Sequence, residues 1–197
     1  MKIKVITSYK PGTWDQYAKK AVDSVLKHWP TDTHVTVYHE AQTQDIFEHP
    51  RLEWIDVHQA QPELVKFKNK YKDDPVANGE IQEIANGVRR PGPMPSKGSF
   101  QWNAVRFANK VFCVTHALSN SNGYDYVIWL DADTYSFRDM PTSFLQEILP
   151  RDSLLTYLGR GGEDPECGFV GYNLNHPEVQ NLNSDWENLY INDGIFG

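Results

Sequence analysis

Apolar residues follow two different periods along the first part of the chain. Residues 2–7 form a short β-branched run that predicts a strand, and similar runs at 34–38 and 52–57 predict two more. Between the first two runs, residues 14–29 carry apolar side chains at steps of three and four, and Pro30 ends this helical pattern. Strand, helix and strand in this order form a βαβ unit, which predicts parallel pairing and a right-handed crossover.

Local signals place the remaining elements. Thr13 and Gln16 have the spacing of a capping box, which predicts that Thr13 caps the first helix. Apolar periodicity predicts further helices and strands, and no internal repeat is present. The helices are expected at residues 62–72, 99–118 and 176–190, and the strands at 127–130, 153–158 and 168–174.

Residues 86–98 differ in composition from the elements on either side. They contain three glycines, three prolines and the basic residues Arg89, Arg90 and Lys97. Such a composition cannot bury a core, so the segment predicts a mobile loop. Because the charge is a local positive cluster in an acidic chain, we expect the loop to close over a bound anionic ligand.

The most informative motif follows the apolar run 127–130 directly. Asp131 and Asp133 are spaced i and i+2, so both carboxylates are expected to leave the strand on the same side. In parallel α/β sheets, ligands bind in the crevice outside the carboxyl ends of the strands. Two carboxylates there predict a site for Mg²⁺ or Mn²⁺, completed by water and substrate phosphates.

The two aspartates also allow other interpretations. An isolated Asp-x-Asp triplet also occurs in solvated turns and helix caps. The apolar strand that precedes the triplet here is what favours a metal site. An EF-hand would need glycine and glutamate where this chain has Ser136 and Thr142. A phosphatase of the haloacid-dehalogenase type would need a small β-branched residue in place of Tyr135, on a strand nearer the amino terminus.

Composition limits the class of protein. A chain of 197 residues and 22.7 kDa, with six tryptophans and ten tyrosines, fits one globular domain with a sizeable core. The net charge of −7 argues against nucleic acid as a partner. No stretch has the length of a transmembrane helix, and two cysteines form neither a disulfide framework nor a zinc site. A cytoplasmic location is the expectation.

Together these segments resemble the GT-A fold glycosyltransferases, most closely small bacterial and viral-type members. The resemblance runs in order through nearly the whole chain and is carried by four blocks: Val5–Tyr9, Arg106–Lys110, Tyr126–Thr134 and Glu166–Asn173. It implies an α/β, Rossmann-like fold with a mostly parallel central sheet flanked by helices. Residues 1–134 would be the nucleotide-binding half of a single domain, and residues 135–197 a partial acceptor-binding half.

The resemblance also implies roles for single residues. On the donor side, the nucleoside and its sugar would be contacted by Thr7, Ser8, Tyr9, Glu40, Arg106, Lys110, Asp131, Ala132, Asp133 and Gly168. Within that set, Asp133 would ligate the metal and Asp131 would contact metal or ribose, while Arg106 or Lys110 would face the diphosphate or the sugar. The acceptor side would be served by Asp164, Glu166 or Asn173, and Gly171 would give the backbone access to the sugar.

The implied reaction transfers a hexose from a nucleotide diphosphate sugar, with a UDP-sugar favoured, to a hydroxyl of a glycan or protein acceptor. An inverting enzyme would need a base, for which Asp164 and Glu166 are candidates. Retaining members often carry Asn-x-Gly where this chain has Glu166-Cys167-Gly168, so the stereochemistry stays open. Because residues 195–197 read as the middle of a domain, relatives are expected to continue further, with another metal ligand.

Two alternative functions remain at this point. A sugar nucleotidyltransferase would use a similar sheet and cation, but it would need a glycine-rich basic loop after the first strand. Here that turn has only Lys10 and Gly12. A non-catalytic nucleotide-sugar-binding module is the alternative from a different class.

Overall fold

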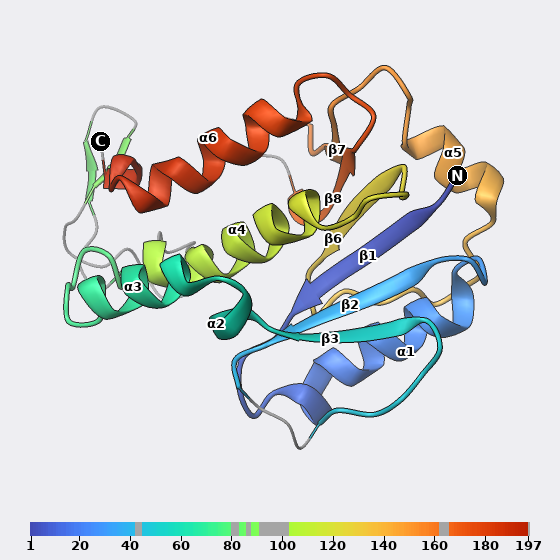
Figure 1. Cartoon of the computed structure of the whole chain (residues 1–197), viewed down its shortest axis with the longest axis horizontal. Coiled ribbons are helices and arrows are strands. Elements are labelled where there is room, and N and C mark those ends of the chain that lie inside the picture. The colour runs from blue at the N-terminus through green and yellow to red at the C-terminus, as the bar shows by residue number, and fades with distance from the viewer. Residues whose placement is uncertain (42–44, 80–82, 86–87, 91–102, 162–165, 197) are drawn as a thin grey trace.

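The computed structural model describes the chain except for residues 42–44, 80–82, 86–87, 91–102, 162–165 and 197. Within the described chain, the main sheet has six strands in the order β3-β2-β1-β6-β8-β7 (Figure 1). The parallel strands are β1 (Ile3–Ser8), β2 (His34–His39), β3 (Leu52–Asp56) and β6 (Tyr126–Leu130). β8 (Glu166–Asn173) and β7 (Leu155–Leu158) add antiparallel pairs at one edge. The expected α/β fold with a mostly parallel sheet is confirmed.

The first helical segment joins β1 to β2 as predicted, but it begins differently. Trp14–Ala18 forms a π-helical turn that leads into α1 (Lys19–His28), which ends before Pro30. The predicted capping box was wrong, because the Thr13 side chain caps no helix N–H. Its hydroxyl instead donates to the carbonyl oxygen of Lys10 at 2.6 Å, so the preceding turn uses the group that the helix would need.

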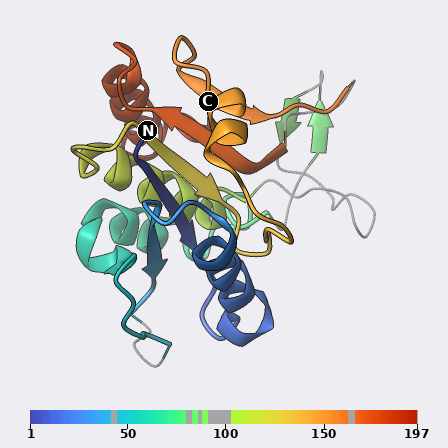
Figure 2. The same cartoon turned by 90° about the vertical axis from the view of Figure 1, so that its right-hand side faces the viewer.

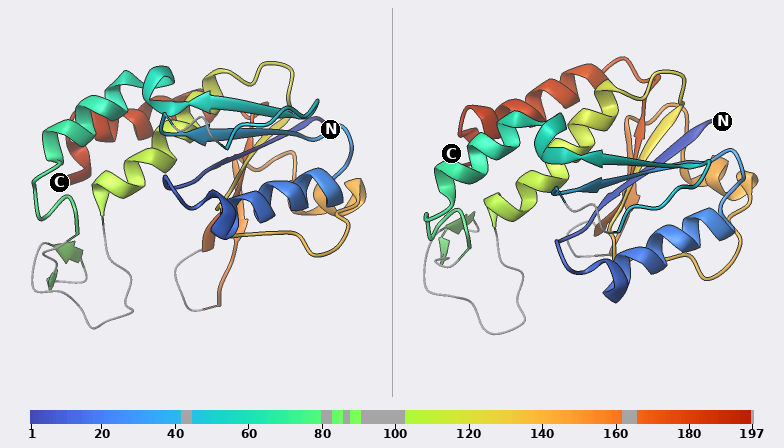
Figure 3. Two further views of the ribbon diagram at one scale, coloured as in Figure 1. Left: turned by 90° about the horizontal axis from the view of Figure 1, so that it is seen from below. Right: turned by 60° about the horizontal axis from the view of Figure 1, so that its bottom comes forward.

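Helices cover both faces of the sheet (Figure 3). On one face, α1 and α5 (Thr142–Ile148) pack over Ile128 and Leu130 of β6. On the other face, α4 (Ala104–Ser119) packs over Val127 and Trp129 of the same strand. Successive residues of a strand point to opposite faces, so a strand covered on both sides must be apolar at every position. This explains why all five residues of β6 are buried.

Three further helices complete the layer around α4. They are α2 (Val57–Ala60), α3 (Pro62–Tyr71) and α6 (Val179–Ile191). α6 packs along α4 (Figure 1). α4 begins at Ala104 because the Asn103 side chain accepts a hydrogen bond from the Arg106 N–H at 2.7 Å, a helix N-cap. Residues 99–102, where the sequence predicted the helix to start, lie outside the described residues.

Part of the predicted loop at 86–98 is a strand. β5 (Val88–Arg90) pairs antiparallel with β4 (Glu83–Ala85), and the hairpin stands apart from the main sheet (Figure 2). The prediction overlooked that backbone pairing can hold a short segment that has no core of its own. Residues 86–87 and 91–98, and the mobility expected for them, lie outside the described residues.

The topology brings the candidate residues to one edge of the sheet. β1 and β6 are adjacent and parallel, so Ser8 and Leu130, at their carboxyl ends, lie at the same edge. Residues that follow these two strands must therefore share a site. None of the helices that the structure describes combines the length and apolar character needed to cross a bilayer.

Candidate active site

A cavity of about 2500 Å³ opens at the carboxyl ends of β1 and β6. Its walls come mainly from the turns after these strands, from α4 and α6, and from β7 and β8. Glu40, after β2, and Lys68, on α3, also line it. Nine of the residues predicted from the sequence line it: Ser8, Tyr9, Glu40, Arg106, Lys110, Asp131, Ala132, Asp133 and Glu166. Residues far apart in the chain thus form one site.

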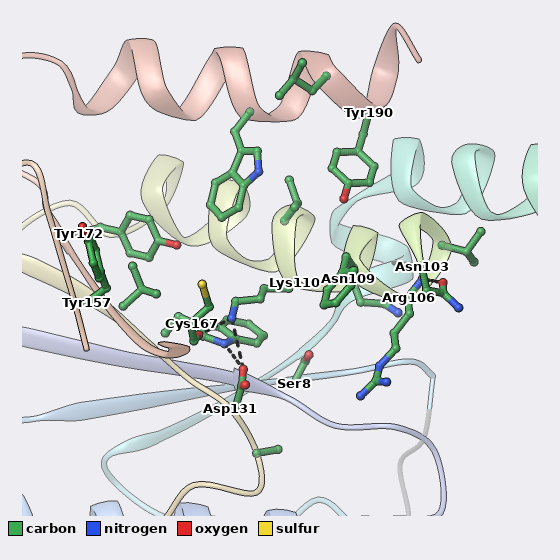
Figure 4. A pocket seen from close by; sticks show the side chains of 18 of the residues that line it. Ser8, Asn103, Arg106, Asn109, Lys110, Asp131, Tyr157, Cys167, Tyr172 and Tyr190 are labelled. Carbon is green, nitrogen blue, oxygen red and sulfur yellow. Dashed lines mark hydrogen bonds and ion pairs between the residues drawn. The ribbon is translucent and has the colours of Figure 1, made fainter. Parts of the chain in front are cut away.

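Asp131 lies at the centre of this site (Figure 4). Its Oδ1 accepts a hydrogen bond of 2.5 Å from Nε1 of Trp129 and one of 3.3 Å from Nζ of Lys110. The Lys110 ammonium also donates to the carbonyl oxygen of Cys167 at 2.5 Å and lies 4.9 Å from the centre of the Trp129 ring. Three partners therefore fix the position of one positive charge beside the Asp131 carboxylate.

The Asp131–Ala132–Asp133 segment is a turn rather than a continuation of the strand. The Asp131 N–H donates to the carbonyl oxygen of Gly168 at 2.8 Å, and the Thr134 N–H donates to the carbonyl oxygen of Asp131 at 2.9 Å. Both carboxylates still line the cavity, but the tight turn orients them, not the alternation of an extended strand. The geometric premise of the sequence prediction was wrong, and its result, two carboxylates in one crevice, is observed.

Gly168 makes room for this arrangement. A Cβ atom at this position would lie 3.2 Å from Oε1 of Glu166 and 3.4 Å from Oδ2 of Asp131. An alanine here would therefore crowd Glu166, while its Cβ would be in ordinary van der Waals contact with the Asp131 carboxylate. Gly171 has a different environment, since a Cβ there would lie 2.5 Å from Cδ2 of Leu149, in the packed layer under the sheet.

The sequence predicts Asp131 and Asp133 as ligands for Mg²⁺ or Mn²⁺. Among the residues that the structure describes, no group of three or more His, Cys, Asp or Glu side chains could hold a metal ion. Among the described residues, the Asp131 side chain accepts hydrogen bonds from Trp129 and Lys110, both through Oδ1. Two carboxylates fit the way Mg²⁺ is held beside phosphates, where substrate and water supply the other oxygens.

The residues at the end of β1 have unequal access to the cavity. Ser8 lines it, whereas Thr7 is buried and does not. Tyr9 lines it with little exposure, because its ring packs 5.1 Å from Trp14 and its hydroxyl donates to Oδ2 of Asp45 at 3.1 Å. Burial, and secondarily Asp45, raises the pKa of Tyr9, so this group stays a neutral donor.

Glu40 reaches the cavity from the end of β2 as part of a charged cluster. Its Oε2 accepts a hydrogen bond of 2.6 Å from Nζ of Lys68 on α3, and Nε2 of His58 lies 3.3 Å from the same oxygen. Lys68 also donates to Oδ1 of Asn109 on α4 at 3.3 Å. Glu40 is therefore held by neighbouring side chains. Lys68 and Asn109, which the sequence prediction missed, line the cavity beside it.

The acceptor-side candidates lie in three different places. Glu166 lines the cavity, accepts a hydrogen bond from the Gly168 N–H at 2.9 Å through Oε1, and forms an ion pair with Arg160 through Oε2. Asp164 lies outside the described residues. Asn173 is buried away from the cavity, where its Nδ2 donates to the carbonyl oxygens of residues 151 and 153.

Basic and acidic side chains line this cavity in equal number, five of each. The basic side chains that line it are Lys10, Lys68, Arg106, Lys110 and Arg160. Three of them face carboxylates in the ion pairs given above. Within the described part of the chain, Lys10 and Arg106 form no ion pair, and Arg106 extends into the cavity beside Ser8 (Figure 4). These two cations can pair with negative charges of a ligand.

Comparison with known proteins adds to this geometry. No protein-family model and no curated protein matches the chain. Solved structures do match: the apo form of the glycosyltransferase GlyE from Streptococcus pneumoniae TIGR4 aligns over 94% of this chain at a TM-score of 0.51 and 12% identity. Mouse xyloside xylosyltransferase 1 aligns over 98% at 0.51 and 10% identity, and the bifunctional glycosyltransferase WbbM over 96% at 0.52 and 12% identity.

The chain has a glycosyltransferase fold. It spans 37% of the GlyE chain, 34% of the WbbM chain and 73% of the xylosyltransferase chain. At 10–12% identity the likeness concerns the fold, so what the site does must be argued from its own residues.

Proposed function

We propose that the chain is a metal-dependent glycosyltransferase, which moves a hexose from a nucleoside diphosphate sugar to an acceptor hydroxyl. A UDP-sugar is the favoured donor. One observation carries the proposal: Asp131, Asp133, Lys110 and Arg106 converge in a single cavity at the carboxyl edge of a mostly parallel sheet. Paired carboxylates beside fixed cations suit a diphosphate and its divalent ion.

In this reaction the acceptor oxygen attacks the anomeric carbon of the donor sugar. The bond from that carbon to the diphosphate oxygen breaks, and the nucleoside diphosphate leaves with the electron pair through an oxocarbenium-like transition state. Negative charge therefore grows on the phosphates as the bond lengthens. Mg²⁺ or Mn²⁺, when held by Asp131 and Asp133, would supply positive charge to both phosphates.

The residues of the chain contribute a fixed electrostatic environment. Lys110 is held by Asp131, the Cys167 carbonyl oxygen and the Trp129 ring, so its ammonium needs little reorganisation when a diphosphate arrives. Arg106 is exposed in the cavity and can reach phosphate by rotating its side chain. These two cations would stabilise the leaving group from the α4 side.

The proton of the acceptor hydroxyl needs a destination if the reaction inverts the anomeric carbon. Glu166 is the candidate inside the cavity, although Arg160 already pairs with it, and that pair would have to open. Asp164 is the second candidate. A retaining reaction would need no such base, and both stereochemical outcomes are part of the proposal.

Release of nucleoside diphosphate from UDP-glucose, UDP-galactose and UDP-N-acetylglucosamine, with and without Mn²⁺, tests the function. We expect Mn²⁺-dependent release that falls by at least about a hundredfold in Asp133→Asn, the size of losing one essential electrostatic group. Asp139→Asn is the matched control, because Asp139 is 89% exposed, lies outside the cavity and pairs only with His28 in the described contacts.

Other products would contradict the proposal in distinct ways. Formation of a nucleotide sugar from nucleoside triphosphate and sugar phosphate would indicate a nucleotidyltransferase. Tight, metal-dependent binding of UDP with no release from any donor would indicate a binding module. Equal activity in Asp133→Asn and Asp139→Asn would show that the cavity is not the catalytic centre.

A further inference from the structure

Strand β7 forms one edge of the main sheet in the described chain (Figure 1). An edge strand presents N–H and C=O groups that another strand can bind, and proteins usually block such pairing with charged residues or proline. The strand at the opposite edge, β3, contains Glu53 and Asp56. β7, with the sequence Leu-Thr-Tyr-Leu, contains neither a charged residue nor a proline. This edge therefore lacks the usual protection against pairing.

The side chains of β7 are also apolar and exposed. Leu155 is 36% exposed, Tyr157 51% and Leu158 50%. Single apolar side chains are common on protein surfaces, but three within one strand of four residues form a continuous patch. Such a patch indicates contact with another molecule.

The backbone of β7 shows which groups face outward. The N–H of Asn173, on β8, donates to the carbonyl oxygen of Leu154 at 3.0 Å. Because every second residue of an antiparallel pair bonds to the neighbouring strand, Thr156 also bonds to β8. Leu155 and Tyr157 therefore direct their N–H and C=O groups away from β8. In the part of the chain that the structure describes, these four groups have no hydrogen-bond partner.

This pattern of outward groups is complementary to itself. When two copies of β7 meet antiparallel about a two-fold axis at Thr156, Leu155 of each copy lies opposite Tyr157 of the other. Each outward N–H then faces a C=O of the second copy, so all the outward groups are paired. The side chains of Leu155 and Tyr157 meet on the same face of the joined sheet, and such pairs stabilise it. A second copy thus supplies a matching strand by symmetry.

The charges at the two ends of β7 agree with the same arrangement. Asp152 precedes the strand and Arg160 follows it, and both are exposed. The two-fold axis would bring Asp152 of each copy toward Arg160 of the other. Arg160 pairs with Glu166 in its own copy, and its guanidinium has donors for a second carboxylate. Arg151, the cation next to Asp152, acts on Asp125 of its own copy.

We propose that β7 is a dimerisation edge, at which two copies of this chain join antiparallel into one continuous sheet. The inference uses no donor chemistry and is independent of the proposed function. A ladder of four residues per strand is smaller than a standard interface of about 1,200–2,000 Å². The dimer is therefore reversible, with a Kd on the order of 10 μM.

The dimer would also change the cavity. Leu155 and Tyr157 line it, on the sheet face that carries their side chains. The same two residues of the second copy would continue this face beyond β7. Each copy would therefore add apolar side chains to the wall of the other copy's cavity.

Sedimentation velocity of the 197-residue chain, at concentrations below and above the expected Kd, tests the association. Wild type should change from monomer to dimer. Tyr157→Pro removes an N–H that faces outward and keeps those that bond to β8, so the fold should remain while the dimer weakens by at least about tenfold. Leu155→Lys, which places a charge on the edge, should have the same effect and serves as the second variant if Tyr157→Pro does not fold.

Phe137→Lys is the matched control for these variants. It makes the same change from an apolar residue to a lysine at a side chain that is 76% exposed and lies outside β7. The control should dimerise like wild type. Equal loss of the dimer in Phe137→Lys and Leu155→Lys would show association through general apolar contact and would overturn the assignment to β7.

A cysteine placed on the axis tests the register. In the proposed pair, Thr156 of one copy faces Thr156 of the other with Cα atoms about 4.5 Å apart, within the range of a disulfide. The two copies of Leu158 would be about 14 Å apart, which is too far. Thr156→Cys should therefore form a covalent dimer on mild oxidation, and Leu158→Cys should not. Both are made with Cys167→Ser, because Cys167 is exposed.

The remaining outcomes separate this inference from the proposed function. A chain that stays monomeric at every concentration would overturn the dimer, and its binding of UDP with Mn²⁺ would leave the proposed function intact. A dimer in which Thr156→Cys forms no disulfide, or forms no more than Leu158→Cys, would place the interface elsewhere and would also overturn the inference. A dimer that binds no UDP would support the inference and contradict the proposed function.

Discussion

Trp129→Phe removes the hydrogen bond that holds the central carboxylate and keeps an aromatic ring beside Lys110. Trp129 is buried, at 3% exposed, and its indole N–H donates to Oδ1 of Asp131 at 2.5 Å. A hydrogen bond to a charged group contributes about 1.5–3 kcal/mol. The ion pair with Lys110 acts on the same oxygen, but the Asp131 side chain is 41% exposed, and ion pairs in contact with water contribute about 0–1 kcal/mol. The indole bond should therefore dominate.

Loss of this bond should let Asp131 leave the geometry that binds the donor. We expect UDP with Mn²⁺ to bind about tenfold more weakly to Trp129→Phe, which corresponds to about 1.4 kcal/mol. Isothermal titration calorimetry measures this directly. Trp54→Phe is the matched control, because its indole also donates one hydrogen bond, to the carbonyl oxygen of Phe47 at 3.0 Å, but Trp54 lies outside the cavity. Equal affinities of the two variants would refute a positioning role for Trp129.

Three further predictions concern stability. Gly171→Ala should destabilise the fold by about 1–3 kcal/mol, because its Cβ would lie 2.5 Å from Cδ2 of Leu149. The melting temperature measured by calorimetry should fall, while the affinity for UDP stays the same. Lys68→Met should lower the free energy of unfolding in urea by about 1–3 kcal/mol, because it removes a hydrogen-bonding cation from Glu40, which is only 19% exposed. An unchanged urea midpoint would contradict this prediction. Burial lowers the pKa of His116 in the folded state. The stability that neutral His116 contributes is therefore complete above its usual pKa of about 6.5 and is lost as the pH falls through the folded-state pKa. His116→Gln should make the free energy of unfolding less dependent on pH, in unfolding measured from pH 7.5 downwards.

Much of the fold was predictable because it depends on patterns within short segments. β6 is a run of apolar residues, β1 and β2 are rich in β-branched residues, and α1 has one continuous apolar stripe. The location of Asp131 at the end of an apolar strand was enough to place it at the carboxyl edge of the sheet. These inferences need no knowledge of which segments meet.

The rest of the site depends on long-range pairing that the sequence pattern does not specify. β8 inserts antiparallel beside β6, and this brings the carbonyl oxygens of Cys167 and Gly168 to Lys110 and Asp131. A strand pattern shows which side chains are apolar but does not select the partner strand or its direction. Lys68 was missed for a similar reason. Its helix was predicted, but its contact with Glu40 arises only when α3 packs beside the end of β2.

Packing in the core and geometry in the site are parts of one structure here. Trp129 and Asp131 are two residues apart, so the indole that fills the core under α4 also reaches the carboxylate in the cavity. Lys110, on α4, lies over the same indole and bonds to the same carboxylate. The distance between α4 and the sheet therefore sets the position of the charge that would face the donor phosphates. A core this closely packed transmits displacements rather than absorbing them. Changes under α4 should consequently alter donor affinity as well as stability, even when no residue of the cavity is replaced.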